Sequence, residues 1–129
     1  MIHKPYRLVS KVWGSERWLA NGPAYCGKVL MIDPGAKTSI HYHQRKVETL
    51  FLATGRVAIY LGGDAFPRAG DGLDPIFCLE PGDCVTIQPY QRHGFHNVGE
   101  TPAVLFEVST QHFEDDSVRE SESAGAPPR

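Results

Sequence analysis

Two histidines one residue apart, His41 and His43, and a nearby glutamate, Glu48, interrupt the otherwise apolar and β-branched stretch 34–55. Imidazole and carboxylate groups are strong ligands for divalent transition metals. On an extended strand, residues i and i+2 project from the same face, so the two histidines point the same way. Glu48 lies at an odd offset from His43, and we expect a tight hairpin over 44–47 to return it alongside on the neighbouring strand. The pattern predicts a facial metal site with open coordination positions.

A further ligand is expected from residues 89–97, which directly follow a strand-like run. If the chain is extended there, His93, Phe95 and Asn97 share one face and His96 faces the opposite way. His93 is therefore the candidate ligand of this segment. A metal-binding histidine needs a partner that orients its ring, and the candidates are Asn97, Gln88 and backbone carbonyls. The histidines without such a setting, which we expect at the surface, are His3, His96 and His112.

The hydrophobic pattern has a period of two along most of the chain, which is typical of half-buried β-strands. Val, Ile, Leu, Phe and Thr dominate these segments, and Gly, Pro and Asp mark the turns between them. The predicted strands are 27–33, 38–43, 48–55, 56–62, 75–80, 83–88, 94–98 and 103–110. Many short strands without an amphipathic helix predict an all-β sandwich or barrel.

Two segments depart from this alternation. Residues 6–22 are less regular, and we expect their two tryptophans, Trp13 and Trp18, to cover one end of the core. Residues 62–74 are rich in Gly, Asp and Pro and predict one long loop that separates two halves of the strand set.

Length and charge bound the remaining possibilities. The 129 residues correspond to one domain that can bury a core without disulfides. We expect this single domain over 1–113, with its core at 27–110, and a polar, largely disordered tail over 114–129. A net charge of −2 indicates no nucleic-acid partner, and no segment has the roughly 20 apolar residues of a membrane span. Three cysteines at irregular spacing indicate reduced thiols and a cytoplasmic protein.

The histidine stretch resembles the first motif of the cupin superfamily, G(X)5HXH(X)4E(X)6G. It is matched at every spacing by Gly35, His41, His43, Glu48 and Gly55. The second cupin motif, G(X)5PXG(X)2H(X)3N, is matched more loosely by Gly82, Pro89, His93 and Asn97. The resemblance implies a double-stranded β-helix, the jelly-roll barrel of cupins. It also implies one divalent metal ion (Zn, Mn, Fe, Ni or Co) in the mouth of the barrel, bound by His41, His43, Glu48 and His93.

Both flanks resemble the type II phosphomannose isomerase domain. The segment 11–18, "KVWGSERW", is similar to the entry of that domain, and 99–122 is similar to its exit. The matching exit positions are Glu107, Glu114, Asp115, Asp116, Val118 and Arg119. This similarity implies a metal-dependent aldose–ketose isomerase or epimerase that acts on a sugar or sugar phosphate, as mannose-6-phosphate isomerase does.

That chemistry removes a proton from a carbon beside a carbonyl, so it requires a general base in addition to the metal. The candidates for this base are Lys46, which lies beside the ligands in sequence, and Glu107, if it projects inward from the last strand. Arg45, Arg92 and Tyr90 are the candidate substrate contacts. Arg92 adjoins a ligand and could offer a bidentate contact to phosphate.

Two other functions remain open from the sequence. Three histidines and one glutamate also suit an Fe- or Mn-dependent dioxygenase, whose activity would depend on oxygen. A non-catalytic metal- and sugar-binding cupin would bind its small molecule without turnover. For any of these we expect a homodimer, because small barrels leave edge strands and an apolar sheet face. Phe51 and Tyr42, outward by strand parity, are the candidates for its interface.

Overall fold

The computed structural model describes residues 1–62, 75–120 and 123–126, with only the backbone given for 75–77. The regular secondary structure of the described part is almost entirely β-strand, and its one helix is a single 3-10 turn. The elements are β1 (Arg7–Lys11), β2 (Gly14–Asn21), β3 (Cys26–Ile32), β4 (His41–His43), β5 (Glu48–Thr54), β6 (Val57–Leu61), β7 (Pro75–Leu79), β8 (Cys84–Ile87), β9 (His93–Asn97), β10 (Ala103–Ser109), η1 (Glu114–Asp116) and β11 (Ser117–Arg119). The eight strands predicted from residue 27 onward are thereby confirmed. Most of the predicted long loop lies outside the described residues.

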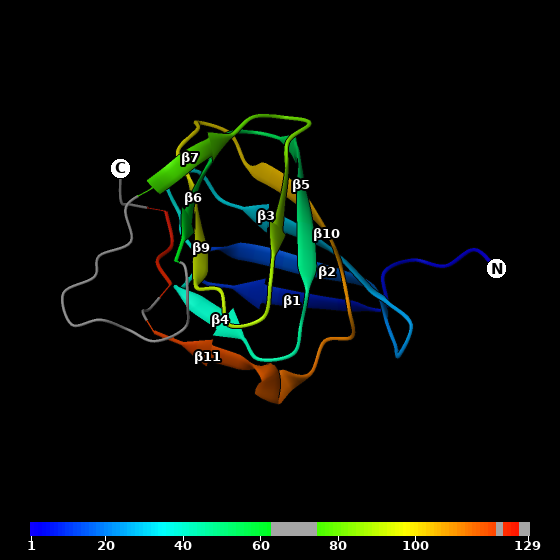
Figure 1. Cartoon of the computed structure of the whole chain (residues 1–129). Coiled ribbons are helices and arrows are strands. Elements are labelled where there is room, and N and C mark those ends of the chain that lie inside the picture. Colours follow the sequence, from blue (N-terminus) through cyan, green and yellow to red (C-terminus); the bar gives the residue numbers. More distant parts are fainter. Residues whose placement is uncertain (63–74, 121–122, 127–129) are drawn as a thin grey trace.

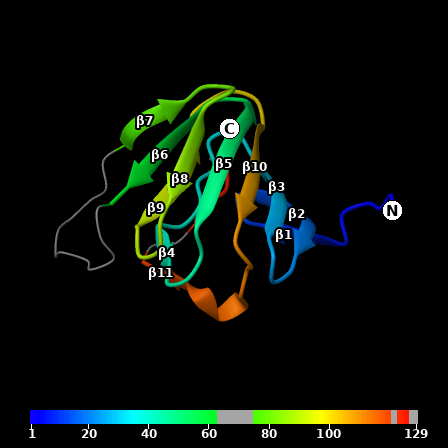
Figure 2. The same ribbon diagram turned by 45° about the vertical axis from the view of Figure 1, so that its right-hand side comes forward.

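The strands form two antiparallel sheets that face each other and enclose a barrel (Figures 1 and 2). Sheet I has six strands in the order β1-β2-β3-β10-β5-β8, and sheet II has five in the order β11-β4-β9-β6-β7. From β3 to β6 and from β7 to β11 the chain alternates between the sheets, so pairs such as β3–β10, β5–β10 and β4–β9 join distant parts of the sequence, whereas β1–β2–β3 and β6–β7 pair consecutively within one sheet. This architecture confirms the all-β jelly-roll barrel.

The core lies between the sheets and contains the inward-facing residues of both. In β3 and β10 every second side chain is buried, as the period of two requires. Ile32, Leu50 and Leu105 of sheet I meet Ile59 and Phe95 of sheet II there. This apolar layer fills one end of the barrel and leaves the other end to polar groups.

The irregular segment 6–22 is a β-hairpin, β1–β2, that extends sheet I beyond β3. Both tryptophans are buried, as expected, and Trp13 belongs to the core cluster. The hairpin depends on Gly14, whose φ of +151° is rare for other residues. A Cβ atom at this position would lie 1.9 Å from the Met31 carbonyl oxygen, so only glycine allows β2 to approach β3 here.

The ordered barrel extends beyond the expected end of the domain at residue 113. We expected 114–129 to be a polar tail, but residues 114–119 form η1 and β11. β11 pairs with β4 at the edge of sheet II, with Ser117 opposite His43 and Arg119 opposite His41. The polar composition gave no indication of a strand here, because the strand is short, lies at an edge and buries little apolar surface.

Candidate metal centre

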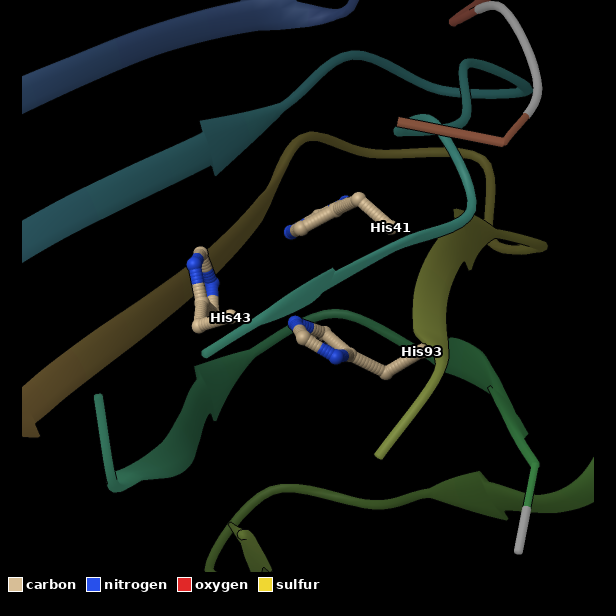
Figure 3. Close-up of side chains that lie close together, drawn as sticks. All are labelled: His41, His43 and His93. Atoms are coloured by element: carbon tan, nitrogen blue, oxygen red, sulfur yellow. The ribbon is translucent and has the colours of Figure 1, made fainter. Parts of the chain in front are cut away.

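Three histidine side chains converge inside the barrel near the edge of sheet II. His41 and His43 project from β4, and His93 projects from β9, where it pairs with His41 across the strands. One ring nitrogen of each lies within 4.8 Å of one nitrogen of each of the others (Figure 3). This spacing allows one ion to contact all three rings. The same-face placement of His41 and His43 and the inward direction of His93 agree with the strand parity.

Each of these imidazoles is held from outside by its Nδ1 atom. For two of the rings the partner of Nδ1 is a backbone carbonyl, which can only accept a hydrogen bond. Nδ1 therefore carries the proton, and Nε2 is unprotonated in the neutral ring. The contacts are His41 Nδ1 to Ser39 O at 2.9 Å, His93 Nδ1 to Gln91 O at 2.9 Å, and His43 Nδ1 to Ser117 Oγ at 3.1 Å. The backbone carbonyls expected as orienting partners therefore serve two rings, and a serine hydroxyl serves the third.

Burial keeps two of these rings neutral at physiological pH. Desolvation and the neighbouring His93 lower the pKa of His41 to about 3. Desolvation likewise lowers the pKa of His43 to about 4, although the carboxylate of Glu48 opposes the shift. Neutral imidazole is the form that binds metal, so both rings are ready to bind an ion without first losing a proton.

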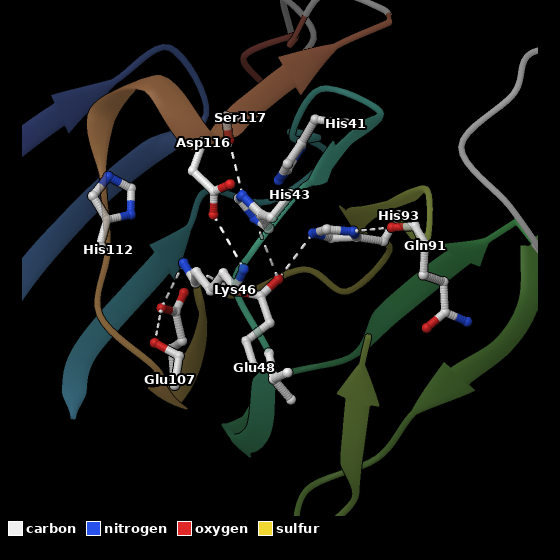
Figure 4. Close-up of polar contacts among 12 residues, drawn as sticks. His41, His43, Lys46, Glu48, Gln91, His93, Glu107, His112, Asp116 and Ser117 are labelled. Atoms are coloured by element: carbon white, nitrogen blue, oxygen red, sulfur yellow. Dashed lines mark hydrogen bonds and ion pairs between the residues drawn. The ribbon is translucent and has the colours of Figure 1, made fainter. Parts of the chain in front are cut away.

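Glu48 reaches two of the three rings from the opposite sheet. Its Oε1 atom lies 2.9 Å from His93 Nε2 and 3.7 Å from His43 Nε2, and the side chain is buried (Figure 4). The expected hairpin over 44–47 is wrong, because β4 belongs to sheet II and β5 to sheet I. The segment crosses between the sheets, so the glutamate faces the histidines across the barrel. Its inward direction was predicted, but for a different reason.

The donor atoms fit a divalent transition-metal ion. His93 Nε2 is fully buried and makes no hydrogen bond of acceptable geometry to any described residue, despite the nearby Glu48 oxygen. Three buried imidazoles beside a carboxylate suit Zn, Mn, Fe, Ni or Co, and do not select among them. The residues that would hold the ion are His41, His43 and His93, with Glu48 beside them.

A lysine lies next to this group between two carboxylates. The Nζ atom of Lys46 is 3.2 Å from Glu48 Oε2 and 2.9 Å from Glu107 Oε2, and all three side chains are buried. Burial alone would lower the pKa of Lys46, but the two carboxylates raise it above its ordinary value. Burial would raise the pKa of Glu48, yet Lys46 and His93 hold it well below its usual range. Burial and the charge of Glu48 raise the pKa of Glu107.

A cavity of about 640 Å³ opens onto these groups and lies between the two sheets, with part of its wall from the segment after β10. His41, His43 and Glu48 line one part of it, and Lys46 and Glu107 lie next to them. His93 is fully buried and lies behind this lining. The rest of the wall mixes apolar side chains, among them Trp13, Trp18 and Leu30, with further charged and polar ones, so the cavity offers both kinds of surface to a ligand.

Two cavity residues were not found from the sequence. Lys28 of β3 is buried, with Nζ 3.1 Å from His112 Nδ1 and 3.9 Å from the centroid of the Trp18 ring. Burial lowers the pKa of Lys28, and it lowers that of His112 to about 4. The expectation that His112 lies at the surface is wrong, because Asn21 exchanges two hydrogen bonds with its backbone and holds it against the cavity. Lys28 could have been found from the sequence, because it is a lone lysine on the inward face of a predicted strand.

The three expected substrate contacts do not line the cavity. Arg45 is exposed and pairs with Asp115 at 2.7 Å. Arg92 faces away from the histidines and lies 2.6 Å from Glu120 Oε2. Tyr90 is half exposed and stacks on Tyr42. Each lies close to the ligands in sequence, but Arg45 and Tyr90 are exposed, and Arg92 is buried against Glu120 outside the cavity.

The motif asparagine, Asn97, does not orient a ligand. Its amide nitrogen donates to the carbonyls of Ile32 and Thr101, both at 2.9 Å, and its side-chain oxygen accepts from the N–H of Gly99 at 2.9 Å. The side chain is fully buried. Asn97 therefore joins the end of β9 to the turn that follows and to the end of β3.

Residues 28–109 match the protein family described as "Cupin domain", and the chain belongs to the cupin family. A protein of Streptomyces cyaneus named polyketide synthase CurC is 36% identical over 78 residues, which are 59% of this chain and 43% of that protein. Mannose-1-phosphate guanylyltransferase of Salmonella muenchen is 24% identical over 125 residues, which are 95% of this chain and 24% of that protein. The chain thus spans less than half the length of either curated relative.

Solved structures share the fold at low identity. The capsular polysaccharide assembling protein CapF from Staphylococcus aureus aligns with a TM-score of 0.73 and 20% identity over 90% of this chain and 35% of that chain. An uncharacterized conserved protein with a double-stranded β-helix domain from Klebsiella pneumoniae aligns with a TM-score of 0.66 and 19% identity over 83% and 84% of the two chains. These likenesses confirm the double-stranded β-helix. In the part of the chain that the structure describes, no helix has the length and apolar character needed to cross a bilayer.

Proposed function

We propose that this chain is a metal-dependent enzyme that moves a proton at a carbon beside a carbonyl, as an isomerase or epimerase of a sugar or sugar phosphate. The observation that carries the proposal is the position of Glu107. This buried carboxylate, with its raised pKa, lines the same cavity as the histidines and Glu48. A metal group and a proton-carrying group that share one cavity are the two components that the reaction needs.

Three histidines and Glu48 would hold the ion. When bound, a divalent ion polarises a carbonyl and stabilises the negative charge that develops on neighbouring oxygens. The cavity opens on the side of His41, His43 and Glu48. A substrate that enters from the cavity therefore meets these groups first, while His93 stays shielded from it.

Glu107 would take and return the proton. A general acid–base group works best when its pKa lies near the working pH, and burial moves this carboxyl group in that direction. Lys46 is the weaker of the two candidates for the base, because its raised pKa keeps it protonated. It would instead hold Glu107 and Glu48 in place by charge. Lys28 and His112 would contact the far end of the substrate in the same cavity.

The sugar-phosphate substrate class is supported by similarity along nearly the whole chain to a mannose-1-phosphate guanylyltransferase. This chain spans about a quarter of that protein, so the guanylyltransferase activity itself is not proposed here. The flanking segments that resemble phosphomannose isomerase domains cover the end of β1 and most of β2 on one side, and β10, η1 and β11 on the other. These strands supply part of the cavity wall, where substrate selectivity would arise.

A second candidate substrate is a polyketide, and the 36% identity to polyketide synthase CurC favours it. The carbon between the two carbonyl groups of a β-diketone loses its proton by the same chemistry as carbon 2 of a sugar. The apolar part of the cavity wall, which includes Trp13, Trp18 and Leu30, suits such a substrate. The two candidates differ in substrate and share the groups that act on it.

Proton exchange in D2O, followed by proton NMR under anaerobic conditions, tests this function. Metal-loaded protein is incubated with aldoses, ketoses, their phosphates and a simple β-diketone. We expect loss of one α-proton signal, a marked slowing in Glu107→Gln, and no change in Glu100→Gln, whose side chain is exposed. Absence, for every compound, of exchange faster than in a protein-free sample would contradict the proposal. Oxygen uptake after air is admitted would then indicate a dioxygenase, and sugar binding without exchange would indicate a binding protein.

We also propose that the protein is a cytoplasmic homodimer. Its three cysteines are free, which supports a reducing compartment. On the outer face of sheet I, Phe51 pairs with Phe106 across the strands, and both are about 40% exposed next to Val108. Tyr42 is not part of this patch, because it lies on sheet II. Phe51→Asp should yield monomers in analytical ultracentrifugation, and Val98→Asp, equally exposed on the β9 side, should not.

A further inference from the structure

One buried carboxylate outside the histidine cluster organises the loop that joins the metal-binding residues. Asp116 is 1% exposed and lies in η1, far from that loop in sequence. Its Oδ1 atom accepts the backbone N–H groups of Gln44 at 3.0 Å and Arg45 at 2.9 Å. Its Oδ2 atom accepts that of Lys46 at 3.1 Å. Three consecutive N–H groups therefore point at one carboxylate.

These N–H groups belong to the crossover between the two sheets. His43 precedes them at the end of β4 in sheet II, and Glu48 follows at the start of β5 in sheet I. The conformation of the crossover therefore sets the position of Glu48 relative to His43. Without the Asp116 side chain the N–H groups of Arg45 and Lys46 would lose this acceptor, and that of Gln44 would keep only the backbone carbonyl of residue 116 at 3.3 Å, so the loop would be freer to rearrange.

The next residue contacts a candidate ligand directly. Ser117 begins β11, pairs with His43 across the strands, and places its Oγ atom 3.1 Å from His43 Nδ1 (Figure 4). This hydroxyl is the polar group that holds the Nδ1 side of that ring. Nε2 of the same ring is the nitrogen on the side of Glu48. Ser117 therefore orients the His43 ring from the side that faces away from the candidate metal centre.

We propose that Asp116 and Ser117 are positioning residues of the metal centre. The segment after β10 therefore contributes to the geometry of the site. Asp116 fixes the crossover that separates His43 from Glu48, and Ser117 fixes the ring of His43. This inference rests on the metal centre proposed above and is independent of which reaction the centre supports. It assigns no contact with substrate to either residue.

Cobalt(II) alone is a sufficient probe of the proposal. Its dissociation constant and visible absorption spectrum are measured for the full chain, together with the urea midpoint of the metal-free protein. Loss of a group that orients a ligand typically weakens metal binding about 10- to 100-fold. We expect Ser117→Ala to fall in this range with a changed spectrum and an unchanged urea midpoint, because the residue is exposed at a strand edge. Ser117→Thr keeps the hydroxyl and should restore binding.

Asp116→Ala should weaken cobalt binding at least as much as Ser117→Ala. Asp115→Ala is the matched control, because Asp115 is exposed and its carboxylate pairs with the Arg45 side chain rather than with the backbone of the crossover. We expect this control to bind cobalt like the wild type. Wild-type cobalt affinity in Asp116→Ala would overturn the role of Asp116. If that variant fails to fold, Asp116→Asn, which keeps one acceptor oxygen and loses the other, takes its place in the comparison. Wild-type affinity and an unchanged spectrum in Ser117→Ala would overturn the role of Ser117. A wild type that binds no cobalt at the histidines would overturn the metal centre as well.

Discussion

Lys46 and Glu107 form a buried ion pair in which the lysine Nζ atom lies 2.9 Å from Oε2 of the glutamate. The same Nζ atom lies 3.2 Å from Oε2 of Glu48. One cation thus connects the carboxylate beside the histidines to the carboxylate proposed to carry the proton. The arrangement explains how two carboxylates can share a buried site, since without the lysine each would be strongly disfavoured in its charged form.

Lys46→Met should destabilise the metal-free protein by about 3–5 kcal/mol, the usual cost of leaving a buried charge without its partner. Urea unfolding measures this change. Lys37→Met, at an exposed position, should have little effect. Adding a divalent metal should restore part of the lost stability, because the ion would supply positive charge next to Glu48. Equal stability of Lys46→Met and the wild type would show that the ion pair contributes little.

His112 should titrate far below the ordinary histidine range. Burial, followed by the charge of Lys28, lowers its pKa to about 4 from an ordinary value of 6.5. The folded state therefore resists protonation, and the stability contributed by neutral His112 above pH 6.5 is lost as the pH falls from 6.5 towards 4. NMR titration of the metal-free protein, with His112→Gln to identify the signal, measures this pKa.

The same titration in Lys28→Met should give a higher pKa for His112, because one nearby positive charge is absent. Burial should still keep that pKa below 6.5. A wild-type His112 that titrates near 6.5 would mean that the ring is open to water and that the cavity wall differs from the one described.

Asn97→Ala should affect folding and leave the metal centre intact. The substitution removes three hydrogen bonds of a fully buried side chain and leaves backbone groups unpaired, which corresponds to about 2–4 kcal/mol of unfolding free energy. Urea unfolding and a metal titration of the same sample separate the two effects. Gln88→Ala, at an exposed position, is the control. A large loss of metal affinity in Asn97→Ala at unchanged stability would contradict the structural role.

The sequence allowed the strands and the three histidines to be predicted, because both depend on the two-residue period of a strand. His41, His43 and His93 project inward as parity requires. The path of the chain between strands does not follow from that period. The crossover after His43 was therefore expected to be a hairpin, and Glu48 was placed on the wrong sheet.

Contacts made by long side chains could not be predicted in the same way. Arg45 and Arg92 lie next to ligands in sequence, yet each pairs with an acidic residue from beyond residue 113. That segment was expected to be a disordered tail, so its acidic groups were not considered as partners. Lys28 could have been found, because it is the single charged residue on the inward face of the strand 27–33.

The location of a bound metal ion tests the central claim most directly. Crystals of metal-loaded protein, measured at the absorption edge of the metal, should show one anomalous peak within about 2.0–2.3 Å of Nε2 of His41, His43 and His93. The peak should be absent from His43→Ala. An anomalous peak elsewhere, or full metal occupancy that persists in His43→Ala, would contradict the proposed centre and the function built on it.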